Sequence, residues 1–396
     1  MTFKVNWSGR SLTYTKEEID AVLKVVREAD PLTQGKYLEE FEQAFAAYTG
    51  TAHCFGVTNG THALELIADL LRLQPGDEVI LPAHTYCATA IPFGRTGATL
   101  RWADIDPETF LVSLDSIKKL VTPKTKAIVV VHLYGMMCDI QAIAKFAKSK
   151  KIALVEDCAQ SLGSFLKGKS CGTFGDFAAF SFHGPKNIST LGEGGMLVVK
   201  NAKLAKLVPG LRHNGTVPFR QQTDYWRPAM VNIDVDLEGV WPHNFSMSEV
   251  QAALGTVLLK RLDPLTKARR ARSMAFRKQM SPFQELVFQK IEDPLTHSHH
   301  LLVARYEGRE TGKTSHDLIR LLGEVYQIKT IVQYYPLYRY DLFKKMGFGK
   351  AHCPQTDQHY DNMISFPFHH WISDQDFEYL MKSTVAALTT LRKEVR

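Results

Sequence analysis

Two segments of the sequence, Lys126-Ala-Ile-Val-Val-Val131 and Ile152-Ala-Leu-Val155, are the strongest indication of the fold class. Both stretches are short, continuous apolar runs, and a helical pattern from Ile140 to Ser149 separates them. Strands of a parallel sheet are covered by helices on both faces, so they read as continuous apolar runs rather than as alternating ones. The segment therefore predicts a strand, a helix and a second strand of one crossover unit.

The same alternation of apolar runs and helical patterns extends through the first half of the chain. We expect further elements at residues 53–57, 62–73, 78–81, 99–102, 114–120 and 177–182. Such an order is typical of a mainly parallel sheet. Ligands of these folds bind beyond the carboxyl ends of the strands, where Asp157 and the segment after Phe182 are expected to lie.

The chain is expected to have three parts. Residues 1–35 predict an N-terminal arm with a helix, because Thr15-Lys-Glu-Glu18 has the spacing of a capping box. Residues 36–262 predict the large domain, and residues 263–396 a small C-terminal domain. A helical pattern from Asn244 to Leu262 continues into the basic segment Lys267-Ala-Arg-Arg-Ala-Arg272, which predicts a long connecting helix.

Composition indicates a globular protein without a membrane segment. Of 396 residues, 45% are hydrophobic and 22% are charged. No uncharged stretch is long enough to cross a bilayer, and the first residues lack the features of a signal peptide, so we expect a cytoplasmic protein with neither membrane nor nucleic acid as a partner. The net charge of +7 could aid the capture of anionic substrates, and it could equally reflect a solvated surface.

The cysteines do not suggest a metal centre. No C-x-x-C pair occurs, so we expect free thiols and no bound metal. The six cysteines are Cys54, Cys87, Cys138, Cys158, Cys171 and Cys353.

One lysine has neighbours that indicate covalent chemistry. Lys186 lies in Ser181-Phe-His-Gly-Pro-Lys-Asn-Ile-Ser-Thr-Leu-Gly-Glu-Gly-Gly195. A lysine forms a Schiff base only when its amine can be neutral, and burial lowers the pKa of an amine. Pyridoxal phosphate needs such a lysine, a carboxylate for its pyridine nitrogen, a stacking face for its ring and donors for its phosphate. The sequence offers a candidate for each of these four groups.

Two of the candidates follow the strand that ends at Val155. Asp157 would keep the pyridine nitrogen protonated, and a protonated ring acts as an electron sink. The alternative is an aspartate that caps the next helix. Gln160 could donate a hydrogen bond to the ring hydroxyl of the cofactor, or it could be an ordinary polar loop residue.

The other candidates concern the phosphate and the face of the ring. In Thr58-Asn-Gly-Thr-His-Ala63, Gly60 permits close approach of the backbone, and Thr61 offers an amide and a hydroxyl at a helix N-terminus. Ser181 could supply a further hydroxyl. Tyr86 could lie flat on the pyridine ring, although an aromatic anchor of the following helix is an alternative.

A set of motifs in fixed order resembles the DegT/DnrJ/EryC1/StrS family of sugar aminotransferases. The resemblance extends from Thr33-Gln-Gly35 to Ser365-Phe-Pro-Phe-His369. Its motifs are Asn-Gly-Thr-x-Ala-Leu (59–64), Pro-Gly-Asp-Glu-Val (75–79), Pro-Ala-x-Thr-Tyr-x-Ala-Thr (82–89), Glu-Asp-x-Ala-Gln (156–160), Ser-Phe-His-x-x-Lys-Asn (181–187), Gly-Glu-Gly-Gly (192–195) and Met-Ser-Glu-Val-Gln-Ala-Ala (247–253).

The resemblance implies an α/β fold, the aspartate aminotransferase-like fold type I of pyridoxal phosphate-dependent transferases, with a mainly parallel central sheet and a smaller C-terminal α+β domain. It also implies a homodimer whose active sites are shared by both subunits. Lys186 would bind the cofactor covalently and carry the proton, and His183 would lie near the substrate. The residues expected to bind the cofactor are Gly60, Thr61, Tyr86, Asp157, Gln160, Ser181, Lys186 and, from the neighbouring subunit, Asn244.

The chain departs from the family pattern at one position of the Asn244 motif. Ser246 stands where the family often has an arginine. If that arginine holds an anionic donor or a nucleotide, the positive charge would have to come from elsewhere in this chain, for which Arg212, Arg220 and His213 are candidates. A dehydrating branch of the family has histidine in place of the lysine. Because Lys186 is present, the sequence favours amino transfer over dehydration.

The predicted function is therefore transfer of an amino group, and the sequence leaves two alternatives open. Glutamate or glutamine would give its nitrogen to a keto sugar, most often a 3- or 4-keto-deoxysugar linked to a nucleotide, in a ping-pong reaction. A pyridoxal phosphate enzyme acting on a non-nucleotide keto sugar or a cyclitol, or a sugar dehydratase, is an alternative. A regulator that binds the cofactor or a sugar without catalysis is a more remote one.

Overall fold

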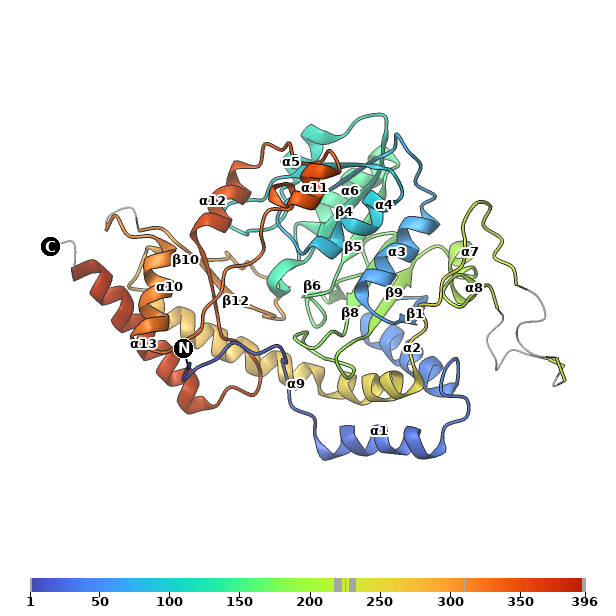
Figure 1. Cartoon of the computed structure of the whole chain (residues 1–396), viewed down its shortest axis with the longest axis horizontal. Coiled ribbons are helices and arrows are strands. Elements are labelled where there is room, and N and C mark those ends of the chain that lie inside the picture. Colours follow the sequence, from blue (N-terminus) through green and yellow to red (C-terminus); the bar gives the residue numbers. More distant parts are fainter. Residues whose placement is uncertain (1, 217–222, 225, 228–232, 309–310, 394–396) are drawn as a thin grey trace.

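The computed structural model describes residues 2–216, 223–224, 226–227, 233–308 and 311–393. A central sheet with helices on both faces forms the larger part of the molecule (Figure 1). One long helix runs from this part toward a smaller group of strands and helices built from the C-terminal sequence (Figure 1). Among the described residues, no helix has the length and apolar character that a bilayer span requires.

The central sheet has seven strands in the order β1-β9-β8-β5-β4-β2-β3. Pairing is parallel between β5 and β8, β4 and β5, β2 and β4, and β2 and β3, whereas β9 pairs antiparallel with β1 and β8. The prediction of a mainly parallel sheet is thus confirmed. The strands are β1 (Cys54–Val57), β2 (Glu78–Pro82), β3 (Thr99–Ala103), β4 (Thr125–Val131), β5 (Ala153–Asp157), β8 (Phe177–Ser181) and β9 (Gly195–Val199).

Strand β4 shows how the apolar runs form the two cores of this part. Its side chains alternate between the two faces of the sheet, as they do in any strand. Ile128 and Val130 pack in one core, whereas Ala127 and Val129 pack in the other. The first core includes apolar side chains of α2 (Lys36–Thr49), α5 (Leu114–Leu120) and α6 (Ile140–Lys150), and the second those of α3 (Gly60–Leu70), α4 (Ile91–Arg95), α7 (Ala202–Ala205) and α8 (Val208–Leu211).

The N-terminal helix forms as predicted, and a second helix follows it. Helix α1 (Lys16–Glu28) begins after Thr15, whose side chain and that of Glu18 make both hydrogen bonds of a capping box. Gly35 is the residue before α2. Both helices pack on α9 (Glu249–Met280).

The start of the long connecting helix differs from the prediction. Helix α9 begins at Glu249 rather than at Asn244, because Ser248 and Gln251 form a capping box that fixes its first turn. Asn244 instead lies in the extended segment before the helix, where it forms a bridge with His213. The predicted domain boundary at residue 262 falls inside α9, and that division of the chain stays a prediction.

The C-terminal sequence builds a small antiparallel sheet with its own core. Strands β10 (Leu286–Phe288), β12 (Leu302–Tyr306) and β13 (Met363–Phe366) pair in that order. Val5 of the N-terminal segment packs in the same core. The helices that follow α9 are α10 (Ser315–Glu324), α11 (Asp341–Lys345), α12 (Pro354–Asn362) and α13 (Asp374–Lys393).

Part of the C-terminal sequence packs on the large sheet rather than on the small one. Leu337, Tyr338 and Phe343 belong to the core that contains Val129. The backbone N–H of Leu337 donates to Ala83 O at 2.9 Å. A third, smaller sheet, in the order β11-β6-β7, also joins distant segments: β11 (Leu295–Thr296), β6 (Phe165–Leu166) and β7 (Lys169–Ser170).

Candidate active site

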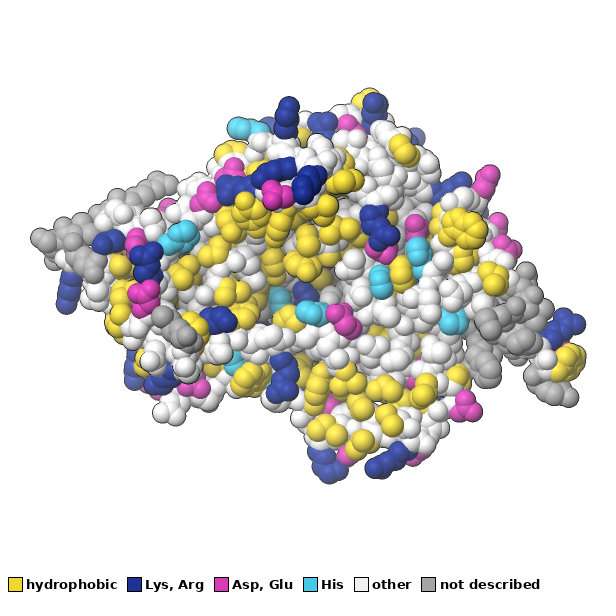
Figure 2. Space-filling view, in the orientation of Figure 1, with side chains coloured by type: hydrophobic (Ala, Val, Ile, Leu, Met, Phe, Trp, Pro, Cys, Tyr) yellow, Lys and Arg dark blue, Asp and Glu magenta, His cyan; other side chains and the backbone are white. Residues whose placement is uncertain are grey.

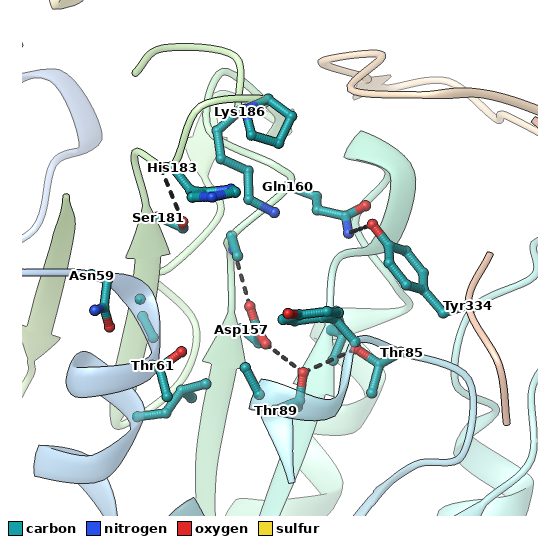
Figure 3. A pocket seen from close by; sticks show the side chains of 18 of the residues that line it. Asn59, Thr61, Thr85, Thr89, Asp157, Gln160, Ser181, His183, Lys186 and Tyr334 are labelled. Atoms are coloured by element: carbon teal, nitrogen blue, oxygen red, sulfur yellow. Dashed lines mark hydrogen bonds between the residues drawn. The ribbon is translucent and has the colours of Figure 1, made fainter. Parts of the chain in front are cut away.

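A cavity of about 320 Å³ lies beyond the carboxyl ends of the parallel strands, where the sequence placed the site. Strand β5 ends in Asp157 at this edge, and β8 ends beside it in Ser181. Figure 3 shows the side chains that line the cavity. Eight predicted site residues lie in its wall: Gly60, Thr61, Tyr86, Asp157, Gln160, Ser181, His183 and Lys186.

Lys186 enters the cavity from the loop between β8 and β9 (Figure 3). Burial lowers the pKa of its amine to about 8, and the carboxylate of Asp157 limits this fall. Nζ has no hydrogen-bond partner among the residues that the structure describes. A sizeable fraction of the amine is therefore neutral near physiological pH and free to react.

Asp157 is fixed in orientation by two hydrogen bonds. Its Oδ2 accepts from Thr89 Oγ1 at 2.8 Å, and its Oδ1 accepts from Ala159 N at 3.0 Å. Burial raises the pKa of this carboxyl group, while the two hydrogen bonds and the positive charge of Lys186 oppose the rise. A buried carboxylate held in this way, at the floor of the cavity, suits a positively charged ring nitrogen.

The start of helix α3 forms a cradle of backbone donors at one side of the cavity. Asn59 caps the helix, accepting from His62 N at 2.9 Å through Oδ1. A Cβ atom on Gly60 would lie 3.0 Å from Ser181 Cβ and 3.2 Å from Phe180 O. Only glycine lets the helix start come this close to the end of β8. The amides of this first turn, with the hydroxyls of Thr61 and Ser181, fit a phosphate group.

Gln160 is held by two tyrosines, of which Figure 3 shows Tyr334 beside its amide group. Its Oε1 accepts from Tyr134 N at 2.8 Å, and its Nε2 donates to Tyr334 OH at 2.9 Å. These partners assign the amide oxygen and nitrogen. One hydrogen of Nε2 remains for the ring hydroxyl of the cofactor.

Tyr86 and His183 lie at the mouth of the cavity. Tyr86 is 57% exposed and its ring meets that of Tyr334 edge to face, with centroids 6.1 Å apart. His183 Nε2 is 3.7 Å from Glu193 Oε1, and both side chains are exposed. The backbone N–H of His183 donates to Ser181 Oγ at 3.3 Å. A bound ring would cover part of the exposed face of Tyr86.

Asn244 does not join the other predicted residues within one chain. Its side chain is exposed and lies outside the cavity wall. Next to it, Ser246 Oγ contacts His213 Nδ1 at 3.0 Å and accepts from Gln34 Nε2 at 2.8 Å. Asn244 thus remains a candidate for a site on another subunit.

The structure treats differently the three residues proposed to replace the positive charge of the arginine that the family often has at position 246. Arg212 is buried, and its Nη1 lies 2.6 Å from both Glu42 Oε1 and Gly56 O, so the proposal that it supplies a free charge is wrong. His213 faces Ser246, but burial and the nearby Arg212 lower its pKa, which disfavours a charged ring. Arg220 lies outside the described residues.

Sequence reasoning gave no role to three side chains that line the cavity. Thr89 was quoted only within a motif, although a hydroxyl at the end of the Pro-Ala-x-Thr-Tyr-x-Ala-Thr pattern was a usable signal. Glu193 was likewise quoted within Gly-Glu-Gly-Gly. Tyr334 lies far along the chain, and nothing near it in the sequence points to Gln160.

A cluster of three buried polar side chains near the end of β5 supports the loop of residues 172–175. His132, Glu156 and Cys158 have possible metal-binding atoms within 4.8 Å of one another. The carboxylate of Glu156 already accepts from Gly172 N, Phe174 N and Gly175 N and contacts His132 Nε2 at 2.9 Å. Its oxygens are therefore engaged in holding residues 172–175.

The fold and the cavity together define the class of the protein. A lysine facing a buried carboxylate, a helix start suited to phosphate, and a mainly parallel sheet beneath them are features of a pyridoxal phosphate-dependent aminotransferase of fold type I. Comparison with known proteins then gives the family. The model of the DegT/DnrJ/EryC1/StrS aminotransferase family matches residues 13–385, and the chain belongs to this family.

Individual relatives agree with this assignment. The spore coat polysaccharide biosynthesis protein SpsC of Bacillus subtilis is 32% identical over 93% of each chain. The dTDP-3-amino-3,4,6-trideoxy-alpha-D-glucose transaminase of Micromonospora megalomicea is 31% identical over 90% of this chain and 92% of its own. The PLP form of Spr1654 from Streptococcus pneumoniae superposes with a TM-score of 0.84, at 27% identity over 98% of this chain and 99% of that one.

Proposed function

We propose that the protein transfers an amino group from glutamate or glutamine to the keto group of a sugar linked to a nucleotide. The observation that carries this proposal is the pairing of Lys186 with Asp157 across one cavity beyond the parallel strands. The transaminase from Micromonospora megalomicea, whose name specifies a dTDP-linked amino sugar, supports the substrate class.

We assign the cofactor contacts from the geometry of the cavity. Gly60, Thr61 and Ser181 hold the phosphate, and Tyr86 covers the ring. Asp157 holds a proton on the ring nitrogen, because a buried carboxylate gains most from a positive partner. Gln160 donates to the ring hydroxyl through the free hydrogen of Nε2.

Lys186 has two tasks in this proposal. When bound, pyridoxal phosphate supplies an aldehyde that takes up the donor nitrogen and a ring that accepts electrons from the reacting carbon. Lys186 Nζ would hold the cofactor through a covalent bond to its aldehyde carbon, and as a free amine it would take a proton from the substrate carbon and return it. Its pKa of about 8 suits both directions of transfer.

Polar side chains line the mouth of the cavity, through which the substrate would enter. There His183 Nε2 lies 3.7 Å from Glu193 Oε1, and both exposed side chains line the cavity. We assign His183 to contact with the sugar rather than with the cofactor. Its exposed side chain can donate to sugar hydroxyls or to a phosphate of the nucleotide.

We further propose a homodimer in which Asn244 reaches the phosphate in the site of the other subunit. Exposed apolar side chains support association, since a monomer rarely leaves many of them in water. Ile19 and Val26 are exposed on α1, where hydrophobic side chains gather in Figure 2, and Trp241, three residues before Asn244, is 86% exposed.

Trapping of the cofactor tests the assignment of Lys186. Borohydride reduction of the holoenzyme followed by peptide mapping should place the cofactor on Lys186, and Lys186→Ala should lose the near-visible absorbance and fall at least about a hundredfold in activity. Turnover by Lys186→Ala at the wild-type rate would overturn the mechanism.

A matched panel of nucleotide-linked and free keto sugars tests the proposed substrate class. Equal values of kcat/KM for the linked and the free sugars would contradict the proposal that the substrate carries a nucleotide.

Mixed dimers test the shared site. Lys186→Ala and Asn244→Ala should each be inactive or nearly so, whereas a mixture of the two after subunit exchange should regain about a quarter of wild-type activity. The mixed dimer has one intact site, with Lys186 from one subunit and Asn244 from the other. No recovery, with exchange verified by differently tagged subunits, would contradict the assignment of Asn244.

A further inference from the structure

The N-terminal segment crosses the loop that carries Lys186. We call residues 4–14 the strap. Figure 1 shows this segment running from the C-terminal part of the molecule toward α1. The strap has no helix or strand of its own beyond the bridge between Val5 and Ile328, so its position depends on contacts with the rest of the chain.

The two ends of the strap are anchored on different parts of the molecule. At one end, Val5 packs in the core of the small sheet, and Lys329 N donates to Val5 O at 2.9 Å. At the other end, Leu12 packs in the core of the large sheet, and Tyr14 OH donates to Ser189 O at 3.0 Å. The strap is thus a built part of the fold rather than a loose end.

Ser11, next to the second anchor of the strap, uses all of its polar groups on these two parts. Its N–H donates to Gly184 O at 3.1 Å, and its hydroxyl donates to the carbonyl oxygen of Lys186 itself. Its own carbonyl accepts from His370 N at 2.7 Å. Ser11 is only 4% exposed, so these hydrogen bonds are shielded from water.

The loop that carries Lys186 needs such support from outside. It lies between β8 and β9 and contains no regular element. Pro185 has no N–H to offer, and within the loop Lys186 N donates to His183 O at 2.9 Å. Four rotatable bonds separate the backbone of Lys186 from Nζ, so a displaced backbone moves the amine relative to Asp157.

We propose that Ser11 is a positioning residue for Lys186, holding the lysine backbone so that the amine meets the aldehyde of the cofactor. This inference rests on the proposed role of Lys186. Ser11 itself contacts neither the cavity nor its ligands, since it is absent from the cavity wall. Its effect is transmitted through the backbone carbonyl of Lys186.

Variants of Ser11 in the full-length protein test the proposal. Ser11→Ala removes the hydroxyl and leaves the backbone hydrogen bonds, and Ser11→Thr restores a hydroxyl. Ser8→Ala is the matched control, because Ser8 lies on the same strap and its hydroxyl donates to Arg10 O at 2.8 Å rather than to a residue of the lysine loop.

The first experiment distinguishes covalent from non-covalent binding of the cofactor. The cofactor is removed from the protein and pyridoxal phosphate is added back. The rate of its covalent attachment, here called capture, is measured by absorbance and, after borohydride reduction, by the mass of the protein. We expect Ser11→Ala to slow capture about tenfold, while the affinity for pyridoxine phosphate, which lacks the aldehyde, changes less than about twofold. Ser11→Thr and Ser8→Ala should capture at about the wild-type rate.

The second readout uses the holoenzyme. Ser11→Ala should lower kcat about tenfold with little change in the KM of the amino donor, because the lysine acts in proton transfer rather than in donor binding. Capture by Ser11→Ala at the wild-type rate would overturn the inference, as would an equal loss of pyridoxine phosphate affinity, which indicates general damage. If borohydride mapping places the cofactor away from Lys186, the proposed site fails instead, independently of Ser11.

Discussion

Thr89 Oγ1 donates a hydrogen bond to Asp157 Oδ2 at 2.8 Å, joining the turn after β2 to the end of β5. Both side chains are buried, so this contact is shielded from solvent. It stabilises the ionised form of a carboxyl group whose pKa burial would otherwise raise further. The ability of Asp157 to pair with a cationic ring nitrogen therefore depends on a residue in the turn after another strand.

Replacement of Thr89 should weaken cofactor binding. Thr89→Val keeps the shape but loses the hydroxyl, so we expect the dissociation constant of pyridoxal phosphate to rise about tenfold, the value of one hydrogen bond to a charged group. Fluorescence titration of the protein with cofactor measures this. Thr89→Ser, which retains the hydroxyl, should stay close to wild type, and an equal loss in both variants would contradict the role.

The buried amine of Lys186 should destabilise the cofactor-free protein below about pH 8. Its pKa is about 8 when folded and near 10.5 when unfolded, so the unfolded chain binds more protons between these values and wild-type stability rises with pH there. Lys186→Met should thus be more stable at pH 7 by up to about 3 kcal/mol, with the difference vanishing near pH 10.5. Urea unfolding at several pH values measures it, and a difference that grows with pH would refute the assignment.

Enlarging Gly60 should separate the phosphate cradle from β8. A Cβ atom there meets Ser181 Cβ at 3.0 Å and Phe180 O at 3.2 Å, so the helix start must shift. Gly60→Ala should raise the dissociation constant of pyridoxal phosphate about tenfold, with a smaller effect on pyridoxal, which lacks the phosphate. Gly94→Ala, where a Cβ first meets Leu100 Cδ1 at 3.4 Å, is the control and should leave both affinities unchanged.

The buried carboxylate of Glu156 should contribute strongly to stability. It accepts three backbone hydrogen bonds from residues 172–175 and contacts His132. Glu156→Gln turns one acceptor into a donor that faces other donors, so we expect a loss of about 3 kcal/mol in the free energy of unfolding. Chemical denaturation measures this against Glu324→Gln, an exposed residue of α10, and equal small losses in both variants would show that the network contributes little.

Much of the fold could be predicted because its signals are local. The apolar run at β4 and the capping box at Thr15 each depend on residues close in sequence, and both predictions are confirmed. The start of α9 was predicted too early, because the helical pattern of the side chains extends back to Asn244 while the capping box at Ser248 fixes where the backbone becomes helical.

The candidate site likewise has residues that could be predicted from the sequence and residues that could not. Eight predicted residues meet in one cavity because each follows a strand or begins a helix at the same edge of the sheet. The partners that orient them were not predicted, since a tyrosine or serine far along the chain has no local pattern that marks it.

The class of sheet, the lysine with its carboxylate, and the helix start that fits a phosphate could all be predicted from the amino-acid sequence. Those features arise from strand ends and turns, where a few neighbouring residues decide the backbone. The contacts of Tyr334 with Gln160 and of Ser11 with Lys186, across 174 and 175 positions of the chain, became known only from the folded structure. Such contacts form when separate elements pack together, so the folded chain, rather than any short pattern, sets the precise place of each reacting group.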